Sequence, residues 1–287
     1  MTAPTNGRAI LLTGANGGIG RACAQALAAK GFHVYAGVRT PAPELDATGI
    51  TQIVLDVTDS GSVAAAADQV ANHRDGQGLH AVINNAGVLV QGPTELVPID
   101  EWHRQFEVNV HGPVRVIQAF LPLLRAGGGR IVNVSAGSAR VAFPFLGPIG
   151  ASKSALESYS ESLRVELAPW RIPVSIVQPG AMRTEIFAKS TASAEAALAE
   201  ADPRTVALYE RQLVAFDTAA AGQRYAPPEV AAAAIVRAVG ARRPKAFYTA
   251  GSDARLAIWL ARIPARVRDH VFQRALGLSG IEPALAH

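Results

Sequence analysis

The sequence of 287 residues contains a single cysteine, 6% aromatic residues and only 17% charged residues. One thiol, Cys23, cannot form an internal disulfide, which excludes a small disulfide-stapled secreted scaffold and favours a reducing compartment. No apolar run approaches the roughly 18 residues that a spanning helix needs, and the N-terminus lacks a basic region followed by a long apolar stretch. We therefore expect a soluble, cytoplasmic protein.

The net charge of +4 is concentrated near the C-terminus. Between Arg237 and Arg274 there are nine Lys or Arg residues against two Asp, a local balance of +7 that leaves −3 for the rest of the chain. A basic tail on a mildly acidic body indicates a local surface role, toward a membrane or an acidic partner. It does not indicate a nucleic-acid-binding protein.

Short apolar runs alternate with longer stretches that have helical periodicity. The predicted strands are Ala9–Thr13, His33–Val38, Gln52–Leu55, His80–Ile83, Arg130–Ser135 and Val174–Gln178, with a seventh near Ala246–Thr249. The predicted helices are Gly20–Lys30, Ser62–His73, Trp102–Leu124 and Ala151–Leu167. Continuous apolar strands alternating with helices predict an α/β protein with a single doubly wound, Rossmann-like parallel sheet and helices on both faces.

Two segments depart from this alternation. Residues 187–225 form an insertion after the last strong strand, where a substrate lid would lie at the carboxyl ends of the strands. Residues 253–287 form a basic amphipathic helical extension, outside a main domain of residues 1–252. Pro264 interrupts it, so we expect two short helices. The extension has one apolar stripe, made of Leu256, Leu260, Ile263, Val267, Val271 and Leu276. We expect it to pack on its own domain, with a membrane surface or a partner subunit as alternatives.

The segment Thr13–Gly20 has the sequence TGANGGIG and lies between the first strand and the first helix. Glycines at this position let the backbone turn tightly and approach a pyrophosphate, whose charge faces the amides of the helix N-terminus. A flexible turn is the alternative interpretation, but the flanking strand and helix favour a dinucleotide site.

Further motifs occur in the same order and spacing as in the short-chain dehydrogenase/reductase family, which this chain resembles over about residues 8–250. They are Asn84-Asn85-Ala86-Gly87, Asn109 in Glu107-Val108-Asn109-Val110, Lys153 in Ala151-Ser152-Lys153, and Pro179-Gly180 with Thr184. The resemblance implies a bound nicotinamide cofactor and hydride transfer to or from a carbonyl or alcohol. It also implies a homodimer or homotetramer formed through the two long central helices.

NADP(H) is favoured over NAD(H) by the end of the second strand. An acidic residue there would bond to the ribose hydroxyls and repel a 2′-phosphate, but this chain has Val38 followed by Arg39, which can pair with a phosphate. Asp56 matches an aspartate that contacts adenine in the family, with a helix cap as the alternative. The candidate cofactor residues are Gly14, Asn16, Gly18, Ile19, Gly20, Arg39, Asp56, Val57, Asn85, Ala86, Gly87, Lys153, Pro179, Gly180 and Thr184.

The catalytic pattern of the family is broken. A tyrosine is expected four residues before Lys153 and a serine thirteen residues before that tyrosine, but these positions hold Ile149 and Ala136. A positioned acid or base contributes about 10²–10⁴ in rate, and a hydrocarbon side chain cannot replace it. The remaining candidate catalytic residues are Asn109, Lys153 and Ser138, which could orient a water.

Other hydroxyl and imidazole groups fit the catalytic position less well. Tyr159 lies too far along its helix, Tyr209 would reach the cofactor only on closure of the lid, and the spacing of His103 and His111 indicates no metal site. Four residues make the expected substrate face apolar and favour a small lipophilic substrate: Ala136, Phe143, Phe145 and Ile149. Packing of the two phenylalanines within their loop is the alternative interpretation.

Three functions are compatible with this pattern. The first is an atypical oxidoreductase acting on a lipophilic carbonyl or alcohol. The second is a non-redox enzyme that catalyses isomerisation, cyclisation or elimination beside the cofactor. The third is a catalytically silent NADP(H)-binding protein or an inactive variant.

Overall fold

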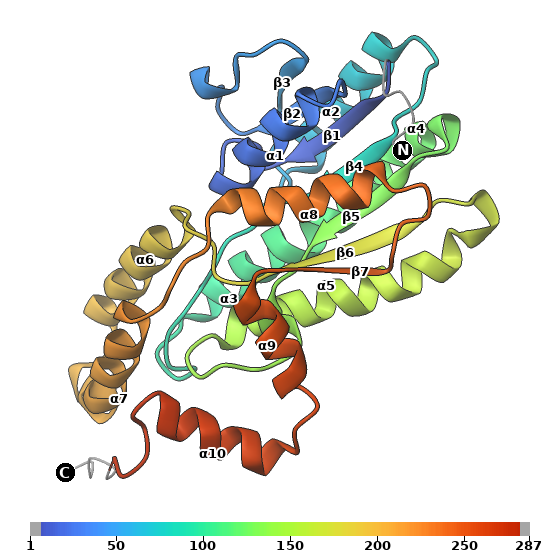
Figure 1. Ribbon diagram of the computed structural model, residues 1–287. Helices are drawn as coiled ribbons and strands as arrows, with labels where there is room; N and C mark the ends of the chain where they lie inside the picture. The colour runs from blue at the N-terminus through green and yellow to red at the C-terminus, as the bar shows by residue number, and fades with distance from the viewer. Residues whose placement is uncertain (1–6, 282–287) are drawn as a thin grey trace.

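The computed structural model describes residues 7–281, in which one parallel sheet forms the centre of the molecule (Figure 1). Its order is β3-β2-β1-β4-β5-β6-β7, and every neighbouring pair is parallel. The strands are β1 Ala9–Thr13, β2 His33–Val38, β3 Ile50–Val54, β4 Ala81–Asn84, β5 Arg130–Val134, β6 Val174–Pro179 and β7 Phe247–Ala250. The predicted doubly wound fold is confirmed, and its strand order reverses between β1 and β4, which opens a crevice at their carboxyl ends.

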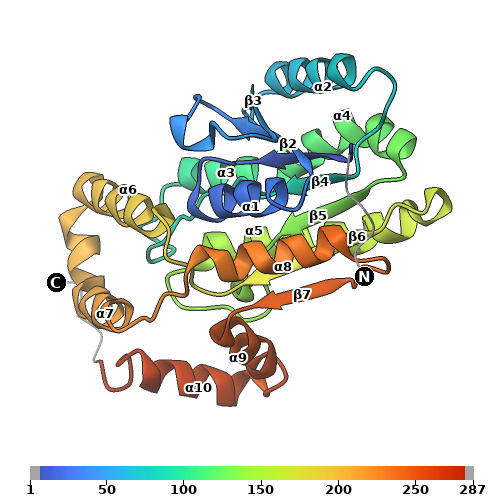
Figure 2. The same cartoon turned by 45° about the horizontal axis from the view of Figure 1, so that its top comes forward.

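Helices cover both faces of the sheet (Figures 1 and 2). On one face, α1 (Gly18–Ala28) and α8 (Pro228–Gly240) pack side by side and bury their alanine-rich faces. On the other face, α2 (Ser60–Arg74), α4 (Gly112–Gly127) and α5 (Gly147–Glu166) enclose a second core centred on Phe120. Small side chains on α1 and α8 let these helices approach each other closely. Between the two helical layers, β1, β4 and β6 are fully buried, whereas the edge strands β3 and β7 are partly exposed.

The predicted helix Trp102–Leu124 is interrupted. The structure has α3 (Ile99–Phe106), a π-helical turn over Glu107–His111, and then α4. Pro113 lacks the N–H group that would bond to the carbonyl of Asn109 in a regular α-helix, which favours a wider turn at this point. The periodicity of the apolar residues alone could not predict this turn.

The two segments outside the alternation are helical. The lid contains α6 (Ile186–Glu200) and α7 (Pro203–Ala221), and the C-terminal extension contains α9 (Ser252–Leu260) and α10 (Ala265–Ala275). The break at Pro264 is confirmed, because this residue is the N-cap of α10.

The predicted tail stripe divides between two environments. Leu260 and Leu276 are half-buried against the cluster formed by Val141, Ala257 and Phe272. The residues that α9 and α10 bury are Ala254, Ala257 and Phe272, whereas Leu256, Val267 and Val271 of the predicted stripe are exposed. Pro264 reorients the second helix, so a stripe drawn through both segments does not follow one face. Within residues 7–281, no helix has the length and apolar character needed to cross a bilayer.

Candidate dinucleotide and active site

The loop between β1 and α1 requires its glycines. Gly14 has a φ of +62°, and a Cβ there would lie 2.8 Å from the Cα of Ala86. A Cβ on Gly20 would collide with the carbonyl oxygen of Gly14. The side-chain amide of Asn85 donates to the carbonyls of Thr13 and Gly14, both at 3.1 Å. The loops after β1 and β4 are therefore joined directly at the crevice.

The segment after β6 closes over this loop. The methyl group of Thr184 lies against Gly18, where α1 begins with no acidic side chain in its first turn. Asp253, at the start of α9, accepts a hydrogen bond from the backbone N–H of Ala181 at 2.6 Å and packs directly on Gly180. The sequence did not single out Asp253, because its partner lies 72 residues away.

The candidate adenosine end lies beyond β2 and β3. Arg39 is exposed, and its charge acts on Asp56. Burial works to raise the pKa of Asp56, but hydrogen bonds from Thr58 and the charge of Arg39 outweigh it and lower the pKa. Asp56 is not a helix cap, since Asp59 caps α2 through the N–H of Gly61 at 2.8 Å. A guanidinium and a carboxylate are thus available at this end.

Other candidate cofactor residues have simpler environments. Asn16 is exposed in the glycine-rich turn and Ile19 is half-buried in the first turn of α1. Val57 is buried against Gly112 at the start of α4. These residues border the same crevice at the carboxyl ends of the strands.

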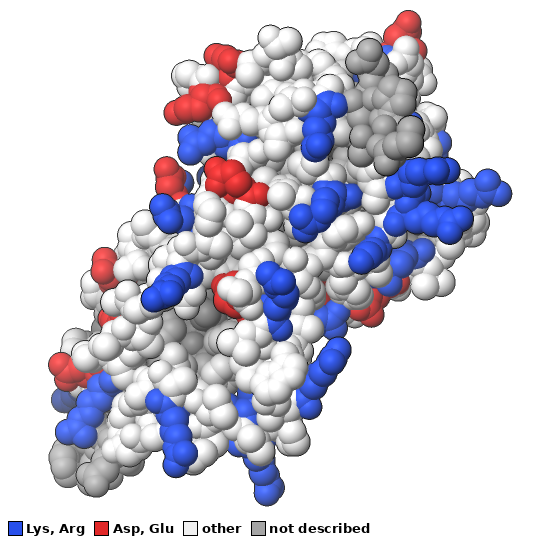
Figure 3. Space-filling view, viewed as in Figure 1, with Lys and Arg blue, Asp and Glu red and all other residues white. Residues whose placement is uncertain are grey.

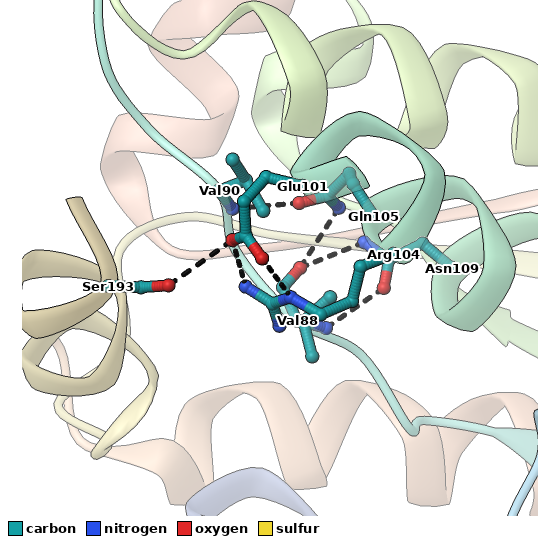
Figure 4. A network of polar contacts seen from close by, with 7 residues as sticks. All are labelled: Val88, Val90, Glu101, Arg104, Gln105, Asn109 and Ser193. Atoms are coloured by element: carbon teal, nitrogen blue, oxygen red, sulfur yellow. Dashed lines mark hydrogen bonds and ion pairs between the residues drawn. The ribbon is translucent and has the colours of Figure 1, made fainter. Parts of the chain in front are cut away.

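The π-helical turn aims Asn109 at the segment after β4 (Figure 4). The amide nitrogen of fully buried Asn109 donates to the carbonyl of Val88 at 2.9 Å, and its oxygen accepts from the N–H of Val88 at 2.9 Å. Gln105 makes a similar contact one turn earlier, with its oxygen accepting from Val90 at 2.7 Å. Both side chains hold the backbone after β4, and Asn109 has its hydrogen bonds satisfied by this role.

Lys153 lies on α5 with its ammonium group inside the site. Its Nζ donates to the carbonyl of Val134, the last residue of β5, at 2.8 Å. A Cβ on Gly87 would lie 3.7 Å from that Nζ and 3.3 Å from Oδ1 of Asn109, so these three residues meet. Burial lowers the pKa of Lys153 to about 8, and the negative charge of Glu157 opposes that shift. The candidate residues Lys153 and Asn109 therefore lie on either side of Gly87.

Glu157, one turn after Lys153, is a buried carboxylate that the sequence analysis missed. It accepts hydrogen bonds from Ser135 at 2.7 Å and Gln178 at 2.8 Å, and Nε of Arg140 lies 2.7 Å from it. This cluster attaches the loop after β5 to α5, and it turns Ser135 away from the site. The i, i+4 spacing to Lys153 was a signal that could have found it.

Ile149 and Ala136, which stand where the family has its catalytic tyrosine and serine, lie beside the candidate site in the structure. Ile149 is buried in the first turn of α5, on the same face as Lys153, and Ala136 is half-buried at the end of β5. Ser138 is half-buried in the next turn, and its backbone carbonyl faces Gly150. Among the described residues, the Ser138 hydroxyl has no hydrogen-bond partner.

The two tyrosines considered as substitutes for the missing acid, Tyr159 and Tyr209, make other contacts. Tyr209 on the lid donates to Glu95 at 2.7 Å, and Tyr159 packs in the core, where burial raises its pKa to about 12. His103 and His111 are exposed beside acidic residues. Within residues 7–281, no group of three His, Cys, Asp or Glu side chains is arranged to hold a metal ion.

A cleft of about 210 Å³ lies between the lid and the segment after β4. Its apolar lining includes Phe145, whose ring meets Phe216 of α7 at a centroid distance of 5.3 Å. Ser190 of α6 is the buried polar residue of this wall, and its hydroxyl has no partner among the described residues. Phe143, expected to line the pocket, instead packs on Phe272 of α10 at 5.0 Å. A left-handed backbone at Phe145, with φ of +62°, separates the directions of the two rings.

The chemical groups that border the crevice fit a dinucleotide. A glycine-rich loop, a helix N-terminus, an exposed guanidinium and a buried ammonium lie along the carboxyl edge of the sheet. Residues 8–195 match the family model of short chain dehydrogenases. The chain belongs to the short-chain dehydrogenase family.

Known members are similar over nearly the whole chain. Retinol dehydrogenase 5 of Mus musculus is 35% identical over 285 residues, covering 93% of this chain and 88% of that protein. A short chain dehydrogenase from Burkholderia cenocepacia J2315 in complex with NADP has 27% identity and a TM-score of 0.71, covering 94% of this chain and 98% of that one.

A family member from Burkholderia phymatum in complex with NAD has a TM-score of 0.74, covering 99% of both chains. Its identity of 24% makes this a likeness of fold. Short-chain dehydrogenases with either dinucleotide therefore share this architecture.

Proposed function

We propose that this short-chain dehydrogenase binds NADP(H) and acts as an atypical oxidoreductase on a lipophilic carbonyl or alcohol, without the serine and tyrosine pair. The observation that carries the proposal is the buried Lys153 ammonium, which meets Gly87 and Asn109 in an otherwise intact site. A buried charge is costly unless it is paired and hydrogen-bonded, and among the described residues this ammonium donates a hydrogen bond to one carbonyl, that of Val134. Charged groups in such environments are concentrated at functional sites.

The preference for NADP(H) rests on the charge at the adenosine end. Arg39 is solvent-exposed directly after β2, and the position before it is Val38 rather than an acid. A 2′-phosphate at this point would gain a bidentate partner and meet no repelling carboxylate from the end of β2. Asp56, with its lowered pKa, stays ionised and is available to ribose or adenine donors.

The reaction also needs a proton donor for the substrate oxygen, and this chain lacks the tyrosine that serves as donor in the family. The cofactor, when bound, supplies or accepts the hydride. Lys153 then holds the proton at Nζ, and its pKa of about 8 suits transfer near neutral pH. The free hydroxyl of Ser138 orients a water between Nζ and the substrate oxygen, since Ile149 and Ala136 can do neither task.

The substrate class follows from the cleft. Its walls combine the Phe145 and Phe216 rings and aliphatic residues with polar side chains that include Glu101, Glu195 and Asp217. The buried hydroxyl of Ser190 has no hydrogen-bond partner among the described residues. Such a lining fits a small lipophilic molecule with a single polar group at the end held by α6.

Cofactor choice is tested with Arg39→Glu. We expect the dissociation constant for NADPH, measured by fluorescence titration, to rise by at least about tenfold, because a charge-assisted pair becomes a repulsion. The affinity for NADH should change by less than about threefold. Equal losses for the two cofactors would overturn the NADP(H) assignment.

Turnover is tested with NADPH absorbance and a panel of lipophilic ketones. Wild-type turnover that falls by about 10² or more in Lys153→Met, with the fold intact by circular dichroism, supports the proposal. Conversion of a substrate without a change in cofactor redox state would favour isomerisation, cyclisation or elimination instead. Tight cofactor binding with no conversion at all would favour a silent binding protein.

The double substitution Ala136→Ser with Ile149→Tyr separates the acid from the rest of the site. Strong dehydrogenase activity in this variant would indicate that the two replaced side chains account for the altered chemistry. Persistent silence would place the fault in the cleft or the cofactor crevice.

Self-association through α4 and α5 stays a prediction from family resemblance. Val165 near the end of α5 is 75% exposed, and burial in a subunit interface would remove this apolar surface from water. Light scattering that gives a dimer or tetramer for wild type and a smaller species for Val165→Glu would support it, and a monomeric wild type would contradict it.

A further inference from the structure

The last two helices expose an apolar surface in an unusually short stretch of chain. We call it the tail surface and define it by four apolar and four basic residues: Leu256, Trp259, Val267, Val271, Arg255, Arg262, Arg266 and Arg274. The apolar members are 56%, 58%, 53% and 43% exposed in the order given. Isolated exposed apolar side chains are ordinary, but four within sixteen residues of basic helix form a patch.

The tail surface is not the face that holds the helices to the protein. Ala254 and Ala257 of α9 pack on Gly137 after β5, and Phe272 of α10 packs on Phe143. Leu256 and Trp259 lie about half a turn away from the two alanines, so they point outward. The domain contact is already complete without the exposed residues.

The charge of these helices is not neutralised locally. Five arginines lie on or between α9 and α10 (Arg268 included), and none forms an ion pair within residues 7–281. Of the two aspartates, Asp253 is turned inward to the N–H of Ala181, which leaves Asp269 on the exposed side. In Figure 3, blue side chains project from the lower part of the molecule, where Figure 1 places α9 and α10.

We propose that the tail surface docks on an anionic lipid bilayer. Short amphipathic helices with Trp and aliphatic residues beside arginines bind at the headgroup boundary, where apolar burial and attraction to anionic lipid act together. A second copy of the chain is a poorer occupant, because a two-fold contact would bring two identical arginine-rich surfaces together without counter-charges. The occupant is therefore a lipid surface rather than a subunit.

The position of the surface connects it to the cleft. The chain after α10 passes next to α7, where a Cβ on Gly277 would lie 3.9 Å from Cβ of Ala215. Phe143 touches α10 while Phe145, two residues on, touches α7. Docking thus places the lid side of the cleft near the bilayer, where a lipophilic ligand is concentrated. This consequence rests on the proposed substrate class, whereas docking itself does not.

The test is co-sedimentation of the full chain with vesicles. One set is pure phosphatidylcholine, and the other is an equal mixture of phosphatidylcholine and phosphatidylglycerol. We expect binding to the anionic vesicles only, weakened by high salt, which screens the attraction. Equal binding to both sets, or to neither, would overturn the proposal whatever the enzyme assays give.

Variants with matched controls locate the contact. Arg262→Glu with Arg266→Glu should lower the partition coefficient by at least about tenfold. The control pair, Arg242→Glu with Arg243→Glu, changes the net charge by the same amount at exposed positions before β7. It should lower the partition coefficient by less than about threefold. Equal losses of binding in the two pairs would indicate a general charge effect and would contradict the tail surface as the site of contact.

The apolar part is tested in the same way. Leu256→Ser with Trp259→Ser should reduce binding by at least about fivefold, whereas Val54→Ser with Trp170→Ser, also exposed, should not. Circular dichroism confirms that each variant is folded. Light scattering distinguishes the remaining occupant: a wild-type dimer that becomes a monomer in Leu256→Ser with Trp259→Ser would identify a subunit interface and overturn lipid docking.

Discussion

Gly20 lies where the first turn of α1 passes over the end of β1. A side chain there meets backbone atoms of Gly14 and Ala15, which cannot rotate away as a flexible side chain would. The position therefore constrains the distance between helix and loop, and with it the space left for a pyrophosphate.

Gly20→Ala should lower the free energy of unfolding by about 1–3 kcal/mol, as overpacking does, and should weaken NADPH binding at least about tenfold. Gly240→Ala is the control, since a Cβ there meets nothing within 4 Å. It should leave stability unchanged or slightly higher. Urea unfolding and fluorescence titration measure both, and equal stability of the two variants would contradict the steric argument.

Lys153 makes the proposed reaction depend on pH. The ammonium donates a proton only in its charged form, and burial lowers its pKa from 10.5 to about 8. The rate of carbonyl reduction should therefore fall as the pH rises through about 8, and alcohol oxidation should rise over the same window. A profile of kcat/KM that is flat from pH 7 to about 9 would exclude Lys153 as the proton donor.

Ser190 carries a buried hydroxyl that has no partner within the described chain. Ser190→Ala removes this unsatisfied group, so the free energy of unfolding should stay the same or rise by up to about 1 kcal/mol. KM for a substrate with a matching polar group should rise about two- to tenfold. In Ser193→Ala, which breaks a hydrogen bond to Glu101 at 3.2 Å, stability should fall instead. An unchanged KM in Ser190→Ala would show that this hydroxyl does not bind the polar group of the substrate.

At the scale of elements, the lid is attached to the body by a few separate contacts. Tyr209 bonds to Glu95, Ser193 bonds to Glu101, and Phe216 packs on Phe145. The helices α6 and α7 bury only one residue completely between them, Ser190. Elements with so little buried surface open at low free-energy cost, so we expect the lid to open more readily than the helices packed on the sheet.

Phe216→Ala should loosen the lid. We expect a loss of about 1–2 kcal/mol in the stability of the lid, faster cleavage between residues 186 and 221 in limited proteolysis, and an increase of about tenfold in KM. Val214→Ala, at a position 61% exposed on the same helix, should change each by little. If both variants were cleaved at the same rate, the ring contact would not be what holds the lid.

At the scale of the whole molecule, His80 links folding to pH. It lies just before β4, stacks on Phe32 and contacts the carbonyl of Val239 at 3.2 Å, joining the sheet to α8. Burial, then the charge of Arg130, lowers its pKa from 6.5 to about 4. The folded protein therefore keeps this imidazole neutral where the unfolded chain would protonate it.

Because the unfolded state binds more protons between about pH 4 and 6.5, stability should be lost as the pH falls through that window. Allowing for solvent that reaches part of the ring, the His80 contribution is about 1–2 kcal/mol. Thermal unfolding from pH 4 to 7 measures the slope, which His80→Gln should flatten. His103→Gln, in an exposed position, should leave the slope as in wild type; a slope unchanged in His80→Gln would refute the linkage.

The organisation of the sheet and the cofactor crevice could be predicted because their determinants are close together in the chain. Apolar runs mark β1 and β4, and glycines mark the turn at Gly14. Lys153 and Ile149 share a helical face by spacing alone, so the apolar replacement of the acid could be predicted to lie beside the ammonium. The orientation of Ser135 toward Glu157 could not, because it depends on how the loop after β5 packs on α5.

The amino-acid sequence by itself determined the class of fold, the position of the glycine-rich loop after β1 and the absence of a hydroxyl at the expected catalytic positions. Each depends on local periodicity, on a missing Cβ or on the identity of one side chain. Only the tertiary structure decided the π-helical turn around Asn109, the inward direction of Asp253, the separation of Phe143 from Phe145, and which face of α9 and α10 meets solvent. These features depend on contacts between residues far apart in the chain, whose free energies no short stretch of sequence contains.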